Sequence, residues 1–466
     1  MNLPLPMFGV LIGLMVALYL VRPSILPFVW SISVFVFPTT RTMIGPAPIY
    51  WYDVVTVALF GVVWYETRNR WPTSVVKWHW IMIGCSAVFG LLFPVIRYGP
   101  SAELLYLWIH MCIAWMCFPI GILIFRSVNK EGYIRSLVIG VALSAVTIAM
   151  VGVYQKGGPD AALAVNVFFR GDMGGMWTES EYGLFRYWQR PNGPFGAATT
   201  FAGVAAIMAL VASAAAQGAY KRWVSVTAAA ALAVVVVTLT RHVLIAALVG
   251  SVVVVASSSI RQKVKVISAV GISIGVIATI GLGMGWDNRF SVWNTSGFLA
   301  DESVAARLLV GPARLVQLLA SDPAVFITGV GLDVQKLASS GVDVGISASG
   351  FVSNGFLLAL YYLGIVGFAC MVSFWIWTFR RASRFSGRVS SWMKGLVAVA
   401  ILIVVSDNYS FMEETAVSGL FLFAGCVVGA PFAIAANSFV RTRPAVLHSQ
   451  PVHSSTRQQG DSRISR

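Results

Sequence analysis

Arginine supplies most of the basic residues in the two longest polar segments of the chain. A planar guanidinium binds phosphate oxygens through two parallel hydrogen bonds, which the ammonium of lysine cannot do. These arginines therefore predict a phosphate-binding surface, and solvated loop charges paired with neighbouring carboxylates are the alternative. The segments are 156–193, which contains Arg186 and Arg190, and 286–352, which contains Arg307 and Arg314.

A further arginine, Arg241, lies between two apolar runs and is followed by His242. A charge at that depth is costly and usually faces a cavity or a partner. Imidazole is the side chain that most readily exchanges a proton near neutral pH. Arg241 and His242 are therefore the candidate catalytic residues, and a simple hairpin cap at the membrane interface is the alternative for Arg241.

The sequence RYWQRPNGPFG begins at Arg186 and leads into an apolar run. Its aromatic rings can stack on sugar rings, while Arg186, Arg190 and Asn192 can bind sugar or phosphate oxygens. This combination predicts substrate binding. Anchoring of tryptophan and tyrosine at the membrane interface, beside a Gly/Pro turn, is an equally good explanation of the aromatics alone.

Long apolar runs must position these residues. The 466 residues are 58% hydrophobic and 11% charged, with a mean hydropathy of +0.79. This composition excludes a soluble enzyme, a nucleic-acid-binding domain and a disordered protein. Runs of about 20 apolar residues predict an all-α polytopic membrane protein with 12–13 transmembrane helices rather than a β-barrel. The runs lie near 5–21, 24–38, 50–66, 77–97, 103–125, 132–155, 194–217, 223–240, 241–259, 264–285, 353–377, 391–408 and 413–435.

The distribution of charge predicts the orientation. One set of loops, including 378–394, holds 22 of the 33 basic residues but three of the 18 acidic ones. Basic loops remain cytoplasmic, so the two arginine-rich segments share the opposite, periplasmic face of a bacterial inner membrane. We expect residues 1–435 to form a multispan membrane domain. Residues 436–466 are expected to form a disordered cytoplasmic tail, because they lack apolar periodicity.

Three motifs together resemble the O-antigen ligase and polymerase family. Ligases of the family carry His-Asn, then nine residues, then Gly-x-x-Gly. This chain matches the pattern at Asn354, Gly364 and Gly367, with nine residues between Asn354 and Gly364, and has Ser353 in place of the histidine. Thr240-Arg241 is similar to the family's Ser-Arg pair at the outer start of a span. The tetrapeptide GVGL at 329–332 is similar to its Gly-x-Gly turn late in the large periplasmic loop.

The resemblance implies a GT-C-like, metal-independent glycosyltransferase that needs no cofactor and uses undecaprenyl-diphosphate-linked oligosaccharide. Because Ser353 replaces the ligase histidine, a Wzy-type polymerase, as in xanthan-like exopolysaccharide systems, fits better than a ligase. The implied partners are the lipid bilayer, a flippase and chain-length-regulator or export proteins, with no nucleic acid. The implied substrate-binding residues are Arg186, Arg190, Asn192, Arg307, Arg314 and Asn354.

The sequence leaves several alternatives open. The general base could be His242 or one of the outer acids Asp333, Glu413 and Glu414. An O-antigen ligase is the second candidate, and a polysaccharide or lipid-linked sugar transporter is the third. A transporter should carry charges near mid-membrane on helices broken by Gly or Pro. His110 lies inside a run without an obvious acidic partner, so we expect it to make a local hydrogen bond.

The orientation can be tested by labelling a cysteine placed at Ser340 in a variant that lacks the native cysteines. We expect a membrane-impermeant maleimide added to intact spheroplasts to label it, because 286–352 is predicted to be periplasmic. A cysteine at Ser386, in the predicted cytoplasmic loop, should be labelled after permeabilisation alone. Labelling of position 340 from the cytoplasmic side would overturn the assignment of both arginine-rich segments to the outer face.

Overall fold

The computed structural model describes most of the residues up to 268 and those from 355 to 441. The described residues are 3–44, 47–68, 73–100, 102–170, 191–195, 198–238, 240–260, 263–268, 271, 275, 313, 316, 317, 320, 323–331, 355–385, 387–406 and 414–441. Within them, seven helices are long and apolar enough to span a membrane, and five shorter apolar helices accompany them. The predicted class, an all-α polytopic membrane protein, is confirmed at this level.

The first half of the described chain is helical except for one β-hairpin. Its elements are α1 (Leu5–Val21), η1 (Pro23–Ile25), α2 (Leu26–Phe35), β1 (Arg41–Ile44), β2 (Ala47–Tyr50), α3 (Trp51–Thr67), α4 (Thr73–Cys85), η3 (Ser86–Leu92), α5 (Phe93–Tyr98), α6 (Ala102–Trp115), α7 (Cys117–Ile124), α8 (Lys130–Gln155) and α9 (Pro159–Arg170). The second half contains α12 (Ala198–Ala216), α13 (Lys221–Thr238), α14 (Arg241–Ala256), α19 (Pro323–Thr328), α22 (Gly355–Ala382), α23 (Gly387–Ser406) and α24 (Glu414–Arg441).

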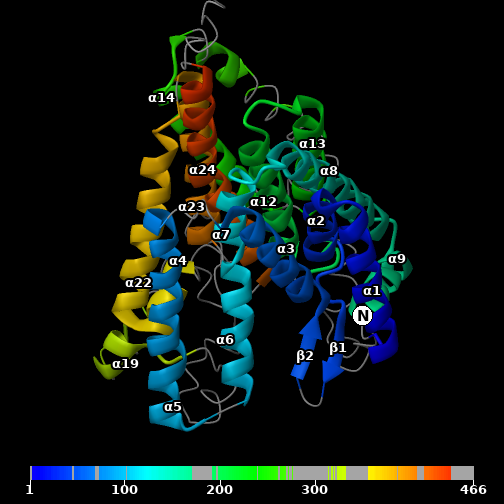
Figure 1. The fold of residues 1–466 in the computed structure, drawn as a ribbon, viewed down its shortest axis with the longest axis vertical. Helices are drawn as coiled ribbons and strands as arrows, with labels where there is room; N and C mark the ends of the chain where they lie inside the picture. The colour runs from blue at the N-terminus through cyan, green and yellow to red at the C-terminus, as the bar shows by residue number, and fades with distance from the viewer. Residues whose placement is uncertain are drawn as a thin grey trace, which may run out of the picture.

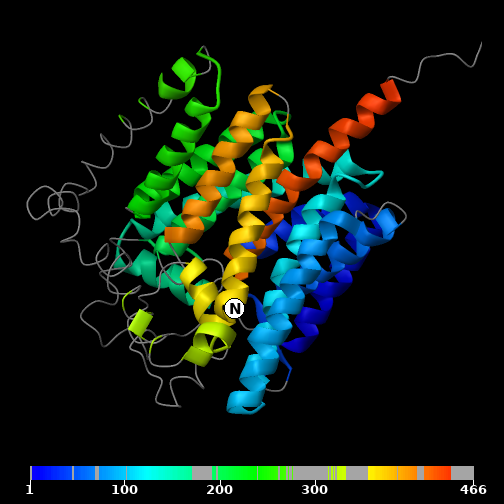
Figure 2. The ribbon, with the colours of Figure 1, turned by 90° about the vertical axis from the view of Figure 1, so that its left-hand side faces the viewer.

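Helix α24 forms the centre of the bundle, where it packs against α7 and α12. Residues 415–430 are buried throughout, as expected for a helix that is apolar on all sides. Glycines bring α7 and α24 close together: a Cβ at Gly121 would lie 2.7 Å from the carbonyl oxygen of Leu422. Helices α22 and α23 lie side by side, with α14 against α23 (Figure 2). Sequence-distant helices therefore form one packed bundle.

Strands β1 and β2 form an antiparallel hairpin between α2 and α3, with Arg41 opposite Tyr50. The hairpin, α5 and α19 lie at the same end of the molecule, which we call the hairpin end (Figure 1). Helix α19 belongs to the segment 286–352, so the hairpin end is the end that the sequence predicts to face the periplasm.

Helix α9 lies inside the segment 156–193, which the sequence predicts to be a polar segment outside the membrane. Its apolar side chains at Ala162, Val165 and Phe169 are buried, because positions three and seven residues apart share one helix face. The hydroxyl of Thr39, just before β1, donates to the carbonyl oxygen of Phe169. This contact fixes the end of α9 to the hairpin end.

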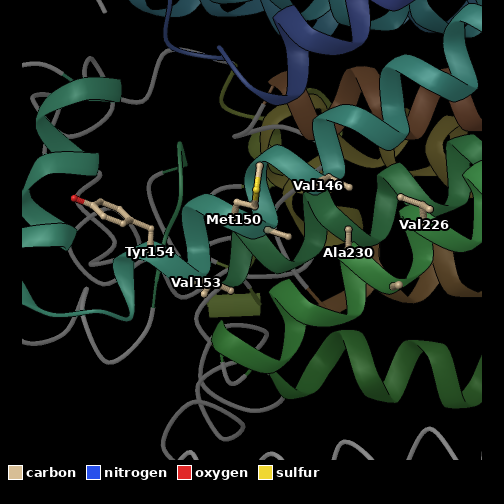
Figure 3. A pocket seen from close by; sticks show the side chains of 8 residues that line it. Val146, Met150, Val153, Tyr154, Val226 and Ala230 are labelled. Atoms are coloured by element: carbon tan, nitrogen blue, oxygen red, sulfur yellow. The ribbon is translucent and has the colours of Figure 1, made fainter.

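Two open apolar grooves lie on the outside of the bundle. One, of about 570 Å³, runs between α8 and α13, with Val146 and Met150 on one side and Val226 and Ala230 on the other (Figure 3). The other, of about 540 Å³, lies between α1 and α2. Apolar lining with few polar groups is the surface that a lipid-facing crevice requires.

The packing of α4 against α22 brings two thiols together, since the Sγ atoms of Cys85 and Cys370 are 3.4 Å apart. A disulfide needs sulfurs about 2.05 Å apart, so a small shift permits the bond. We expect copper-phenanthroline to form an intramolecular Cys85–Cys370 disulfide in membranes. With a protease site inserted near residue 340, the cleaved halves should migrate together on a non-reducing gel.

Cys370→Ser is the matched control, because it removes one partner and leaves the other four cysteines. Cleaved halves that separate after oxidation, although both thiols react with a membrane-permeant maleimide, would contradict the observed contact between α4 and α22.

Candidate functional site at the hairpin end

Asn192 is fully buried in a network of side-chain amides that joins three elements. Its Oδ1 accepts a 2.8 Å hydrogen bond from Nε2 of Gln155, the last residue of α8. Its Nδ2 donates to Oδ1 of Asn166 on α9 at 3.0 Å. Oε1 of Gln155 accepts a further bond from the backbone N–H of Gly193 at 2.7 Å. We call these residues the amide network; such a satisfied buried network holds one geometry.

Arg241 is the first residue of α14 and is half-buried. The preceding Thr240 is buried and donates to the hydroxyl of Thr238, with 2.9 Å between the Oγ1 atoms. Extended backbone at Thr240 makes the turn from α13 into α14. The first backbone N–H groups of a helix have no intrahelical partners and favour anions. The guanidinium of Arg241 and the start of α14 therefore combine two groups that attract negative charge.

The amide network and Arg241 lie at the same end of the bundle. Oγ1 of Thr240 is 3.5 Å from the carbonyl oxygen of Ala198, the first residue of α12, and the Asn192 turn leads into that helix. Gly152 of α8 lies against Phe201, and a Cβ there would be 3.4 Å from Val237 of α13. The structure thus brings together two of the residues that the sequence predicts for the site.

A turn from the large segment 286–352 is bound to a break in α22. Backbone N–H groups of Val330 and Gly331 donate to the carbonyl oxygens of Tyr361 and Tyr362, at 2.9 and 3.0 Å. Helix α22 is broken at Gly364, where φ is +67° and ψ is −169°. The N–H groups of the turn therefore bind carbonyl oxygens that, in an unbroken helix, would accept hydrogen bonds from the next turn of the same helix. The two glycine motifs of the sequence meet at this junction.

Glycine is required at the junction because the two backbones touch. A Cβ at Gly329 would lie 2.4 Å from the carbonyl oxygen of Tyr362, and φ at Gly329 is +72°. A Cβ at Gly364 would lie 2.1 Å from the carbonyl oxygen of Ile327. A Cβ at Gly331 would lie 2.2 Å from Pro94, which places α5 against the same turn.

The structure overturns the expectation that His110 lacks an acidic partner. Nδ1 of His110, on α6, lies 2.8 Å from Oδ2 of Asp53, in the first turn of α3. Both side chains are buried, with 4% and 5% of their surface exposed. The ring of Tyr50 meets the imidazole edge-on at 5.2 Å, and Nη1 of Arg41 lies 3.3 Å from the Tyr50 hydroxyl. The pair therefore lies beside the hairpin.

Asp53 and His110 are the functional candidates that sequence reasoning missed. They are far apart in the chain, and the repeat of apolar residues does not show which helices become neighbours. A usable signal was present, because both are ionisable residues within predicted spans, and such residues need partners.

No protein-family model matches the chain, and no curated protein matches its sequence.

The other predicted residues lie outside the described part of the chain. They are Arg186, Arg190, Arg307, Arg314 and Asn354, together with the alternative bases Asp333 and Glu413. His242 is described and follows Arg241 in the first turn of α14, half-buried. Partial burial lowers the pKa of Lys156, which follows Gln155 at the end of α8.

The junction predicts that Gly329→Ala destabilises the protein. The new methyl would meet the Tyr362 carbonyl and force a left-handed backbone that non-glycine residues adopt at a cost of about 1–3 kcal/mol. We expect a lower melting temperature and lower abundance, measured by fluorescence-detected size-exclusion chromatography of detergent extracts.

Gly61→Ala on α3 is the matched control, since nothing lies within 4 Å of a Cβ at that position. Equal stability of the two alanine variants would show that the turn does not pack against α22 as described.

Proposed function

We propose that the chain polymerises undecaprenyl-diphosphate-linked oligosaccharide repeats at the periplasmic face of a bacterial inner membrane. The observation that supports this most is the convergence of polar groups at the hairpin end. Asn192, Arg241 and the glycine junction match the positions of the sequence motifs, and the first two occupy one end of an apolar bundle. A lipid-linked substrate requires such an arrangement, because its sugars are polar and its carrier is buried in the bilayer.

Arg241 has the role of stabilising the leaving group. As the bond between the sugar and the diphosphate breaks, negative charge develops on phosphate oxygens. The guanidinium of Arg241 supplies a two-pronged donor, and the start of α14 adds backbone N–H groups. Arg186, Arg190, Arg307 and Arg314 would contribute further donors from the two arginine-rich segments, as the sequence predicts.

The glycine junction positions the large periplasmic segment. By binding residues 330 and 331 to the break in α22, it holds one point of segment 286–352 against that helix. Holding a loop at one point reduces the conformational entropy that the loop loses when it binds substrate.

Two observations favour a transporter as the second candidate function. Helix α22 is broken at a glycine, and α3 and α6 share a buried acid–histidine pair. Broken helices and intramembrane ionisable pairs are typical of transport proteins. An O-antigen ligase is the remaining candidate, with Ser353 in place of the ligase histidine as the feature that disfavours it.

The products of a deletion strain separate the three candidates. We expect the strain to accumulate single repeats on the lipid carrier, facing the periplasm, and the wild-type gene to restore long chains. Full-length chains retained on lipid would indicate a ligase. Repeats that never reach the periplasmic face would indicate a transporter.

In the same strain, Arg241→Ala should abolish long chains while the protein accumulates normally. Arg241→Lys should also lower the yield of long chains by at least about tenfold, because a point charge cannot reproduce a bidentate diphosphate contact. Arg135→Lys is the matched control; it is an exposed arginine near the start of α8. If Arg241→Lys gives a normal yield of long chains at matched protein abundance, Arg241 acts only as a helix cap and does not bind the diphosphate.

A further inference from the structure

Asp53 and His110 form a buried pair in which a carboxylate lies beside an imidazole nitrogen. Oδ2 of Asp53 faces Nδ1 of His110 at 2.8 Å. An imidazole whose Nδ1 faces a carboxylate keeps its proton on that nitrogen and can accept another at Nε2. No hydrogen bond to Nε2 of His110 occurs within the described residues, so this nitrogen remains available to accept a proton.

Burial makes the pair unusual, because the other buried polar side chains among the described residues are uncharged Ser, Thr, Asn and Gln. Oδ1 of Asp53 is buried and has no hydrogen-bond partner among the described residues. A buried carboxylate oxygen without a donor is rare in folded proteins and calls for a bound hydroxyl or water. Together, Oδ1 of Asp53 and Nε2 of His110 offer two acceptors, which suits a hydroxyl group that must lose its proton.

The pair lies beside the other polar groups of the hairpin end. Tyr50 of the hairpin contacts His110, and the backbone N–H of Trp51 donates to the carbonyl oxygen of Thr40 at 2.8 Å. The neighbouring Thr39 is bonded to α9, which carries Asn166 of the amide network. One continuous set of contacts therefore joins the pair to Asn192, across the hairpin.

We infer that His110, oriented by Asp53, is the general base of the reaction, and this inference rests on the proposed function. The acceptor sugar hydroxyl attacks the anomeric carbon of the donor, forming a new C–O bond. The bond between that carbon and the diphosphate oxygen breaks, and its electron pair leaves with the lipid diphosphate. The hydroxyl proton moves to Nε2 of His110, and Asp53 stabilises the imidazolium that forms. His242 then has no required part in proton transfer.

The test compares purified variants in vesicles that contain lipid-linked oligosaccharide repeats. We expect His110→Gln to lower kcat by about 100-fold or more with little change in KM, because the base acts in the transition state. His242→Gln is measured alongside it, because the sequence makes His242 the alternative base. His79→Gln, on α4, is the control for loss of a histidine, and the melting temperature of each variant shows that it is folded.

Variants of Asp53 distinguish a positioning role from a structural contact. Asp53→Asn removes the charge that stabilises the imidazolium, so we expect it to lower kcat with little change in KM. Asp53→Glu keeps a carboxylate beside the imidazole and should recover part of that loss.

The outcomes separate this inference from the proposed function. If wild-type protein lengthens chains and folded His110→Gln retains its kcat, His110 is not the base and the polymerase proposal stands. If His242→Gln loses activity instead, the base is His242. If wild-type protein leaves the repeats unchanged, the proposed function fails, and the assignment of His110 as a base in sugar transfer falls with it.

Discussion

A lipid bilayer offers no hydrogen bonds to backbone groups, and this constraint governs the arrangement around α22. The break at Gly364 leaves carbonyl oxygens of Tyr361 and Tyr362 without their helical donors, and the turn at Val330 and Gly331 supplies replacements. Segment 286–352 is thereby tied to the bundle at residues 330 and 331 by backbone hydrogen bonds. Glycine is needed wherever the two backbones touch.

The same constraint explains why polar side chains gather at one end. The amide of Asn192 is bonded to Gln155 and Asn166, and Asp53 lies beside His110, so each buried polar side chain has a polar neighbour within the protein. The hairpin joins the two groups through Thr39 and Tyr50. A polar layer that is held rigidly at the edge of an apolar bundle is suited to bind a head group while the lipid carrier stays in the membrane.

Helix positions were predictable from hydropathy because long apolar runs have one stable structure in lipid. The run 132–155 became Lys130–Gln155, and the run 241–259 became Arg241–Ala256. Helix α9 and the hairpin were missed, since α9 is amphipathic and the hairpin strands have four residues each. Asp53 and His110 stand out in the sequence as ionisable residues within apolar runs, but their pairing does not, because which helices become neighbours depends on packing rather than on periodicity. The glycine motifs were recognised, but their contact needed the three-dimensional structure.

The central proposal is that this chain lengthens a lipid-linked glycan. The direct measurement is mass spectrometry of the products formed by the purified protein in vesicles with synthetic undecaprenyl-diphosphate-linked repeats. Polymerisation predicts a ladder of products spaced by one repeat, each still attached to one lipid diphosphate, with one free lipid diphosphate released per addition. Repeats that remain single, or that move across the membrane without growing, would contradict the claim.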